Sequence, residues 1–420
     1  MKKEKWSLKK YGYLPIIISL CFLMILVGLG FCSSNRSLYL APITEALGIK
    51  RSMFSISDSF RFVTTAIVNL FFGTLVSKFG TKKLIGAGFV SLILCMLCYA
   101  YTNHVWGFWI GSIFLGIGLS WTTTTMVGCV VNKWCKEKHG TIMGAVLAAN
   151  GLGSALATQI VSPIIYEEGN AFGYRNAYKL IVVLLLITGG LIMLFYKEKP
   201  EEAGEKTAGK KHGGAKGGDV SLANGGIKQT SYFYLVAICI FMTGFVLQGI
   251  GGISSAHMKD VGLDAAYIAT MVSFHSLALA GFKFLSGVLY DKFGLRVITT
   301  VCDVAAVVAI LSLAFVTDTM YGKGLALVYA VISSLALPLE TVMLPIFARS
   351  LFDKTSYNKI LGIFVSVNTA GYALGSPVMN AVYDATGSYK SALLICCTVM
   401  IAITIGFQYI MKIAKEDKKA

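Results

Sequence analysis

The sequence repeats the stretch GTLVSKFGTKKL, at Gly73–Leu84, as GVLYDKFGLRVI, at Gly287–Ile298. A second pair of similar stretches follows further along each half: GTIMGAVLAANGLGSA, at Gly140–Ala155, resembles NKILGIFVSVNTAGYA, at Asn358–Ala373. The chain therefore consists of two similar halves in the same order. Parallel repeats of this kind in a membrane protein predict a binding cavity between the halves.

Long apolar runs surround both copies of the repeat. Apolar residues make up 55% of the chain and charged residues only 14%, whereas a soluble protein carries about a quarter charged residues. Runs of roughly 17–25 apolar residues cross the ~30 Å hydrocarbon layer as helices, because backbone polar groups in lipid must bond within their own segment. We expect an all-α membrane protein with twelve transmembrane helices in two pseudo-symmetric six-helix bundles. The expected spans are residues 14–34, 58–76, 84–101, 107–131, 141–163, 178–196, 232–255, 266–289, 297–316, 324–347, 360–382 and 391–411.

One long hydrophilic stretch, Lys197–Thr230, divides the apolar runs into two groups of six. It is rich in Lys, Glu and Gly and cannot bury enough apolar surface to fold. We therefore expect an N-terminal bundle over residues 1–196, a flexible cytoplasmic linker over 197–230 and a C-terminal bundle over 231–420. The basic N-terminus and first apolar run resemble a signal peptide, but the run is long and has no small-residue cleavage site, so we expect a retained first span.

The net charge of +16 indicates membrane orientation rather than a nucleic-acid partner. If the N-terminus is cytoplasmic, 27 of the 37 Lys and Arg fall in inner segments, which is the positive-inside pattern. We expect a multi-pass protein of the cell (inner) membrane with cytoplasmic N- and C-termini. Its expected partners are the lipid bilayer, a small-molecule anion and, for coupling, protons, and we expect a functional monomer.

No sequence motif indicates catalysis or a cofactor. The ten Cys lie mostly in apolar runs, without disulfide or metal-ligand spacing. The patterns HxxxH, GxxxxGK[ST] and CxxC…CxxC are absent from the sequence. We therefore expect no enzyme activity, no cofactor and no metal site.

The repeated loop resembles the G-x-L-x-D-x-x-G-x-[RK] signature of the major facilitator superfamily. The second copy matches at Gly287, Leu289, Asp291, Gly294 and Arg296. The first copy matches at Gly73, Leu75, Gly80 and Lys82–Lys83. The resemblance implies that both loops gate the cytoplasmic side, where the Asp faces a helix N-terminus and a basic partner. Ser77 stands at the Asp position of the first copy, so we expect a weaker contact in the first half.

Two further features resemble the oxalate:formate antiporter and monocarboxylate transporter group. NKWCKEKHGTIMG, at Asn132–Gly144, is similar to that group's N-x-W-F-x-x-x-R-G-x-x-x-G stretch, with Cys135 for Phe and His139 for Arg. Lys283 stands where the group typically has an Arg that holds the substrate carboxylate. The second cation of the oxalate antiporters corresponds to Asn368 here, so the resemblance implies a monocarboxylate rather than a dicarboxylate.

Ionisable residues inside spans are costly and usually face the bundle interior. Lys283 is a candidate contact for the substrate carboxylate, as a point charge. Its alternatives are a snorkelling lysine or a structural pair with Glu340 or Asp303. Arg61 is a candidate for attracting the anion at the outer gate, and its alternative is a salt bridge to Asp58 or to a neighbouring helix.

The register that aligns Gly73 with Gly287 also pairs Arg61 with His275 and Asn69 with Lys283. His275 is a candidate proton relay near neutral pH, or else a hydrogen-bonded interior histidine. Glu340, in a proline-interrupted stretch, is a candidate carrier of a coupling proton or a structural partner of Lys283.

Neutral polar residues are further candidates for hydrogen bonds to the substrate, and their alternative is packing between helices. These candidates are Asn69, Trp121, Asn150, Asn368 and Tyr372. Arg36, at the outer end of the first span, is expected to anchor the chain at the membrane interface.

Together these features predict a secondary active transporter of a small, monocarboxylate-like organic anion, working by alternating access as a proton symporter or an anion exchanger. The alternatives are an exporter of drugs or other amphipathic compounds and, from another class, a membrane sensor that transports nothing. Because Lys283 corresponds to Asn69, we expect an asymmetric site with its main anion contact in the second half.

Overall fold

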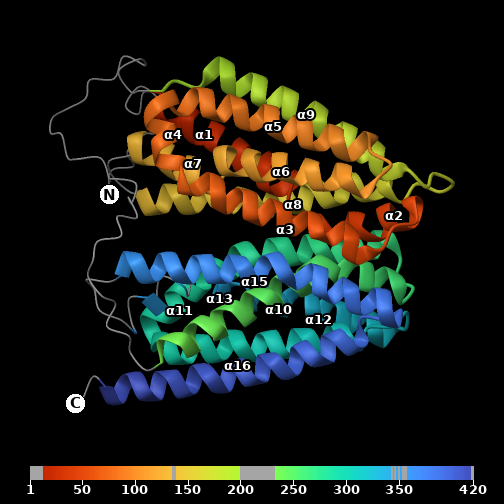
Figure 1. Ribbon diagram of the computed structural model, residues 1–420, viewed down its shortest axis with the longest axis vertical. Helices are drawn as coiled ribbons and strands as arrows, with labels where there is room; N and C mark the ends of the chain where they lie inside the picture. Colours follow the sequence, from red (N-terminus) through yellow and green to blue (C-terminus); the bar gives the residue numbers. More distant parts are fainter. Residues whose placement is uncertain are drawn as a thin grey trace, which may run out of the picture.

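Helices form two bundles, one from each half of the sequence (Figure 1). A computed structural model describes residues 13–134, 139–198, 232–341, 344, 347–348, 351 and 357–417. No strand occurs within these ranges. The red-to-yellow helices of the first half make up one body in Figure 1, and the green-to-blue helices of the second half make up the other. The predicted all-α, two-bundle fold is confirmed.

The bundles contain helices of very different lengths. The first holds α1 (Leu14–Ile25), the π-helix η2 (Leu26–Phe31), α2 (Ser37–Leu47), α3 (Arg51–Leu70), α4 (Phe72–Phe79), α5 (Thr81–Tyr101), α6 (Val105–Thr122), α7 (Thr124–Trp134), α8 (His139–Ile165) and α9 (Gly173–Phe195). The second holds α10 (Phe233–Asp260), α11 (Ala265–Ala314), α12 (Met320–Ala336), α13 (Pro338–Thr341), α15 (Tyr357–Thr386) and α16 (Lys390–Asp417). The linker predicted at 197–230 lies almost wholly outside the described residues.

Most of these helices are long and apolar enough to cross a membrane. Within the described ranges nine helical stretches qualify, and α3 with α4, bent by 60°, makes a tenth if the pair is one span. α12 is a shorter apolar helix of 17 residues, and α15 has 30 residues but a more polar sequence. The count of twelve spans stays a prediction, although helix occupies most of the described part of every expected span.

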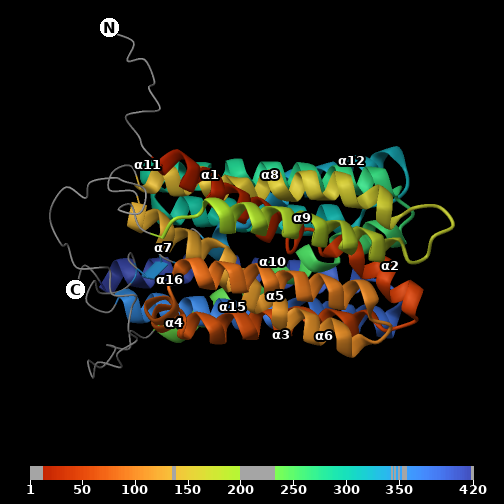
Figure 2. The same ribbon diagram turned by 90° about the horizontal axis from the view of Figure 1, so that it is seen from above.

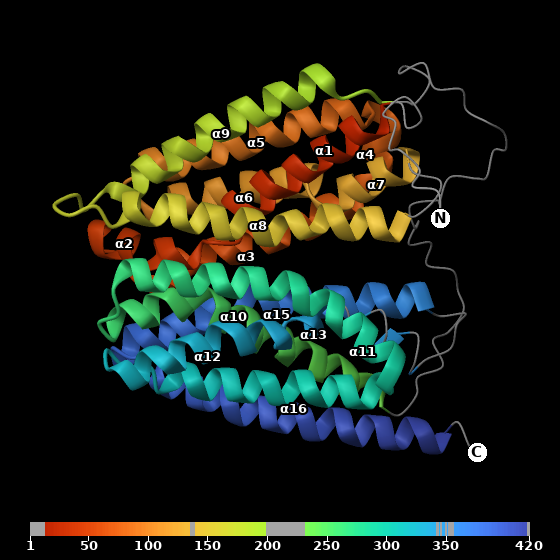
Figure 3. The ribbon, with the colours of Figure 1, turned by 180° about the vertical axis from the view of Figure 1, so that it is seen from behind.

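The helices run between two ends of the molecule (Figure 2). We call the end where α9 finishes and α10 begins the linker end. The opposite end, which carries the connection between α8 and α9 at residues 166–172, is the loop end. Seen from behind, the ribbons of the two bundles lie close together at the loop end and diverge toward the linker end (Figure 3).

Matching glycines pack helices tightly in both halves. A Cβ atom on Gly153 of α8 would lie 2.3 Å from the carbonyl oxygen of Leu26 in η2. A Cβ atom on Gly371 of α15 would lie 2.3 Å from the carbonyl oxygen of Phe241 in α10. The two glycines occupy the same position in the second pair of similar stretches. The same close helix contact is therefore built twice, as expected where lipid removes the hydrophobic force between helices.

We expect Gly153→Ala to destabilise the fold, because the added methyl group meets backbone atoms rather than a movable side chain. Overpacking of this kind costs about 1–3 kcal/mol. The control is Gly190→Ala in α9, where nothing lies within 4 Å of the added Cβ. The control should be neutral or stabilise by up to about 1 kcal/mol, since Gly weakens a helix interior. Thermal unfolding in detergent measures both, and equal transitions for the two variants would contradict the prediction.

The repeated loops turn at Gly80 and Gly294, whose φ angles of 79° and 77° are the left-handed values that favour glycine. Thr81 begins α5 directly after Gly80, and its backbone N–H donates to Glu198 Oε1 at 2.9 Å. A carboxylate thus faces a helix start in the first half even though Ser77 replaces the usual Asp. Sequence reasoning missed Glu198 because it follows α9, far from the loop in sequence.

Candidate functional site

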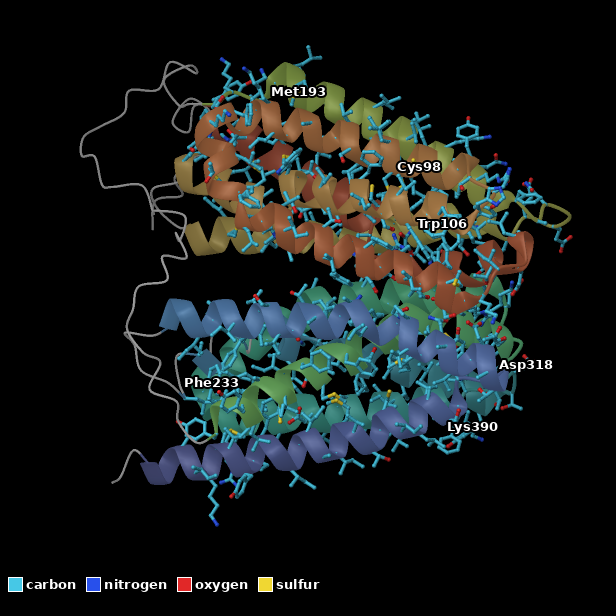
Figure 4. All side chains as sticks on the ribbon, in the orientation of Figure 1. Cys98, Trp106, Met193, Phe233, Asp318 and Lys390 are labelled. Atoms are coloured by element: carbon cyan, nitrogen blue, oxygen red, sulfur yellow. The ribbon has the colours of Figure 1, made fainter. Side chains whose placement is uncertain are left out.

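A cavity of about 290 Å³ lies between the two bundles, where the repeat predicts one. Its wall comes from the turn after η2, α3 and α8 in the first half, and from α10, α11 and α12 in the second. Figure 4 shows the side chains of both bundles, with Asp318 and Lys390 marking the loop end and Phe233 the linker end. Among the described lining residues, those that are charged or titratable are Arg36, Asp58, Arg61, His275 and Tyr329.

Three charged side chains of the first half meet at the cavity wall. Asp58 Oδ1 lies 3.0 Å from Nε of Arg36 and 3.3 Å from Nη2 of Arg61. The three side chains are between 10% and 17% exposed, so salt and water screen their charges weakly. Because two guanidinium groups share one carboxylate, this cluster carries one positive charge in excess.

Arg36 has a protein partner at each of its three guanidinium nitrogens. Nη1 donates to the Tyr99 hydroxyl at 2.8 Å, Nη2 donates to Ser57 Oγ at 2.7 Å, and Nε faces Asp58. The prediction that Arg36 anchors the chain at the membrane interface is wrong, because the turn at residues 32–36 directs this side chain into the bundle. Nε of Arg36 thus faces the same carboxylate oxygen that Arg61 contacts.

Arg61 has fewer partners than Arg36. Nη1 donates to Ser33 Oγ at 2.7 Å, and the guanidinium carbon lies 4.1 Å from the centre of the Phe62 ring. Nε is buried and has no hydrogen-bond partner among the described residues. The salt bridge to Asp58, one of the two sequence interpretations of Arg61, is confirmed. The remaining N–H groups leave Arg61 with donors for an anion in the cavity.

His275 lines the cavity from α11, opposite the charged cluster. Its Nδ1 lies 3.2 Å from the carbonyl oxygen of Ala330 and 2.9 Å from Ser333 Oγ. Nδ1 donates to these acceptors in one tautomer, and in the other tautomer it accepts from the Ser333 hydroxyl. The ring stacks on Tyr329 with 6.5 Å between the ring centres. His275 is thus a hydrogen-bonded interior histidine that also reaches the cavity, and its role in proton coupling stays a prediction.

Among the neutral candidates, Asn150 of α8 lines the cavity. Its Oδ1 accepts a hydrogen bond from Ser34 at 2.9 Å, which joins α8 to the turn after η2. The other neutral candidates do not line this cavity: Asn69, Trp121, Asn368 and Tyr372. For these four, contact with the substrate stays a prediction without a place in the described cavity.

The side chains of Lys283 and Glu340 lie outside the described residues. Lys283 follows Leu279, which lines the cavity, by about one helical turn on α11. Glu340 belongs to α13. Asp303, an expected structural partner of Lys283, is buried, and neither of its carboxylate oxygens has a hydrogen-bond partner among the described residues. The roles predicted for Lys283 and Glu340, and an asymmetric site centred on Lys283, stay predictions.

The remaining residues of the gating motif also stay predictions. Arg296 Nε donates to Gln408 Oε1 at 2.8 Å and links α11 to α16. Gly73 lies in α4 and Gly287 in α11, while the side chain of Asp291 lies outside the described part of the chain.

Ion pairs join the two bundles at the loop end. Arg51 of α3 donates through Nη1 and Nη2 to the carboxylate of Asp260 in α10, at 2.5 Å and 2.7 Å. Lys259 Nζ of α10 lies 2.6 Å from Glu45 Oε2 of α2. Asp384 of α15 accepts a hydrogen bond from the backbone N–H of Arg51 at 3.1 Å. We call these five residues the ionic rim.

Neutral hydrogen bonds join the bundles at the cavity wall and between the cavity and the ionic rim. We call this set the hydroxyl interface, and it consists of Ser37 with Ser255, Ser55 with Asn380, Ser154 with Ser276, and Gln159 with Ser273. These hydrogen bonds and the ionic rim lie at the cavity or nearer the loop end. The loop end is therefore closed over the cavity.

A family model described as Major Facilitator Superfamily matches residues 18–335 and 236–420. The uncharacterized MFS-type transporter YcxA of Bacillus subtilis is 23% identical over 274 residues, which are 64% of this chain and 64% of YcxA. The hexuronate transporter of Bacillus subtilis is 24% identical over 403 residues, 91% of this chain and 90% of that protein. Human monocarboxylate transporter 2 is 19% identical over 356 residues, 79% of this chain and 71% of that protein.

Solved structures show the same fold. The crystal structure of the nucleoside transporter NupG superposes with a TM-score of 0.77 at 12% identity, covering 95% of this chain and 99% of NupG. The relatives and the structural neighbour are all transporters rather than enzymes.

Proposed function

We propose that this chain, which belongs to the Major Facilitator Superfamily and is a multi-pass membrane transporter, moves a small organic anion by secondary transport. The anion binds in the cavity between the bundles, and the bundles rock about it so that the cavity opens to one side of the membrane at a time. The substrate is monocarboxylate-like, and the coupling is proton symport or anion exchange.

The observation that carries this proposal is the charge of the cavity wall. Arg36 and Arg61 share Asp58, and the excess positive charge is buried, where a charge acts strongly. A carboxylate in the cavity balances that excess, whereas a cation meets repulsion. The planar guanidinium of Arg61 is also the side chain best suited to donate two parallel hydrogen bonds to a carboxylate.

The repeat indicates that the fold does not require these charges. In the register that aligns Gly73 with Gly287, Asp58 corresponds to Val272. Arg61 corresponds to His275 in the same register. Both counterparts line the cavity from the second half. Since two similar bundles form with different residues at these positions, the charged cluster is better explained by substrate binding than by folding.

The names of two relatives support an anionic substrate. A hexuronate and a monocarboxylate each carry a carboxylate group, and the proteins named for them align with most of this chain. The resemblance of Asn132–Gly144 to the oxalate:formate antiporter and monocarboxylate transporter group points the same way. We place this chain near that group.

The proposal assigns a second cation and a path for protons. Lys283 attracts the carboxylate from the second half, while His275 and Glu340 are the groups available to carry a coupling proton. The positive-inside pattern supports a cytoplasmic linker end, and in that orientation the closed loop end faces outward in a cell membrane.

Counterflow in proteoliposomes tests the function. Liposomes that contain the purified protein are loaded with one unlabelled compound, and the same compound in labelled form is added outside at two pH values. The compounds are monocarboxylates, dicarboxylates, a hexuronate and a lipophilic cation. We expect exchange of the organic anions, with monocarboxylates fastest. Movement of the lipophilic cation alone would contradict anion transport and favour drug export.

We expect Lys283→Ala to reduce monocarboxylate uptake to the level of empty liposomes while the protein still folds, because the cation that this proposal assigns to the substrate carboxylate is lost. The control is Lys292→Ala, an exposed lysine further along α11, which should leave uptake unchanged. Folding is checked by size-exclusion chromatography. Undiminished uptake by Lys283→Ala would show that this lysine is structural.

A further inference from the structure

We propose that Asp58 sets the charge of the transported anion, because it neutralises one of two cavity arginines and so makes the site select a singly charged anion over a doubly charged one. This inference rests on the proposed function and deepens it. It makes Asp58 a specificity-determining residue that acts through charge balance.

The first step is the sharing of one carboxylate by two cations. One oxygen of Asp58, Oδ1, forms the ion pairs with both guanidinium groups, at 3.0 Å from Nε of Arg36 and 3.3 Å from Nη2 of Arg61. At this burial neither arginine loses its proton, since Arg stays charged in proteins. The cluster therefore has a fixed charge of one positive unit.

The second step separates the two arginines. Arg36 donates hydrogen bonds from Nη1 and Nη2 to Tyr99 and Ser57, and its Nε forms an ion pair with Asp58 without a hydrogen bond, so all three of its nitrogens face protein partners. Arg61 is engaged at two nitrogens, and its third nitrogen has no partner among the described residues. An anion in the cavity is therefore received by Arg61, while Asp58 occupies the side of Arg61 that faces Arg36.

The third step is the charge balance of the described residues that line the cavity. With His275 neutral, the described lining residues carry two positive charges and one negative charge. One carboxylate of a substrate completes the balance. Lys283 and Glu340, which the proposed function adds to the site, carry one charge of each sign when Glu340 is ionised and leave this balance unchanged. A second carboxylate therefore exceeds the positive charge of the site, and an unpaired buried charge is strongly unfavourable.

The position of Asp58 tolerates an uncharged residue as far as helix packing is concerned. Its counterpart in the second half is Val272, which also lines the cavity. A replacement by the isosteric Asn keeps the shape of the side chain and removes only its charge. Asp58→Asn is therefore the direct test.

The experiment compares two probes of equal length that differ by one charge: succinate and its monoamide, succinamate. Each competes with a labelled monocarboxylate in counterflow with full-length protein in liposomes at pH 7.5. For the unaltered protein we expect succinamate to compete at lower concentration than succinate. For Asp58→Asn we expect the half-inhibitory concentration of succinate, divided by that of succinamate, to fall by about tenfold or more.

A double variant controls for indirect effects. Arg36→Gln combined with Asp58→Asn removes one charge of each sign, restores the single positive excess and should return the preference to succinamate. If Asp58→Asn alone does not fold, Ser33→Asp adds a carboxylate next to Arg61 and should abolish competition by succinamate.

Two results would overturn the inference while leaving anion transport intact: an unchanged ratio in Asp58→Asn, or a preference for succinate in the double variant. Retained competition by succinamate in Ser33→Asp would overturn it as well. Failure of the unaltered protein to exchange any organic anion would instead overturn the proposed function, so the two failures are distinguishable.

Discussion

Replacement of Arg61 by glutamine is expected to reduce anion uptake to the level of empty liposomes. Arg61 supplies the donors that remain available in the charged cluster, and its loss leaves Arg36 and Asp58 as a neutral pair. Truncating a charged group that binds a buried opposite charge costs about 2–5 kcal/mol, which is roughly 30-fold to several thousand-fold in affinity. Uptake of a labelled monocarboxylate in proteoliposomes measures the effect.

A matched variant distinguishes the effect of losing the anion contact from the general effect of losing an arginine. Arg175 of the same half donates to Asn103 at the loop end, away from the cavity, so Arg175→Gln should transport normally. The variant Arg61→Gln should also keep the elution profile and thermal unfolding of a folded protein, because Arg36 retains its partners. Transport by Arg61→Gln at more than a tenth of the normal rate would exclude this residue as the anion contact.

Replacement of Arg51 by alanine is expected to open the loop end. Arg51 makes two hydrogen bonds to Asp260 in the other bundle, and its guanidinium carbon lies 4.1 Å from the centre of the Tyr383 ring. Its side chain is 7% exposed. Removing one partner of a buried pair costs about 3–5 kcal/mol, and here the cost falls on the closed state alone, because Asp260 regains water when the bundles separate. The population of the open state should rise by about 100-fold or more.

The opening can be followed at Ser55, a buried residue of the hydroxyl interface. In a Ser55→Cys background, labelling by a membrane-impermeant thiol reagent added from the loop side should be at least about tenfold faster with Arg51→Ala. The control is Lys259→Ala. Its pair with Glu45 is 29% and 53% exposed, and exposed pairs contribute only about 0–1 kcal/mol. Equal labelling in the two variants would show that Arg51 does not hold the loop end closed.

The fold follows from the sequence because its determinants are local and repeated. The apolar runs define helices without reference to any distant residue, and the repeat at Gly73–Leu84 and Gly287–Ile298 defines two like bundles. The repeat also explains why Gly153 in one bundle and Gly371 in the other make equivalent close contacts with a neighbouring helix, since equivalent helices pack in equivalent ways. The break at Gly294 in α11 falls where the sequence predicts one, between the expected spans 266–289 and 297–316. The 60° bend between α3 and α4 lies inside the expected span 58–76, where the apolar pattern gives no signal of it.

The site is only partly predictable, because it depends on how side chains meet across helices. Arg61, His275 and Asn150 are identified from their polar character within spans, and all three line the cavity. Arg36 and Asp58 lie at the boundaries of the expected spans, where a charge is ordinary, so the sequence indicates Arg36 only as an interfacial anchor and Asp58 only as a salt-bridge partner of Arg61. One signal exists: Asp58 corresponds to a valine in the second half, and a charge that appears in one copy of a repeat alone indicates function.

The hydroxyl interface has a consequence for how fast the protein can cycle. When Ser154 and Ser276 separate, each hydroxyl exchanges one neutral partner for a water molecule, and no charge is stripped of its hydration on the return. The activation barrier for swinging the bundles therefore contains little ionic desolvation near the cavity. Ionic strength should alter the lifetime of the closed rim through its exposed pair, Lys259 with Glu45, and leave the rate at which the bundles separate at the hydroxyl interface almost unchanged.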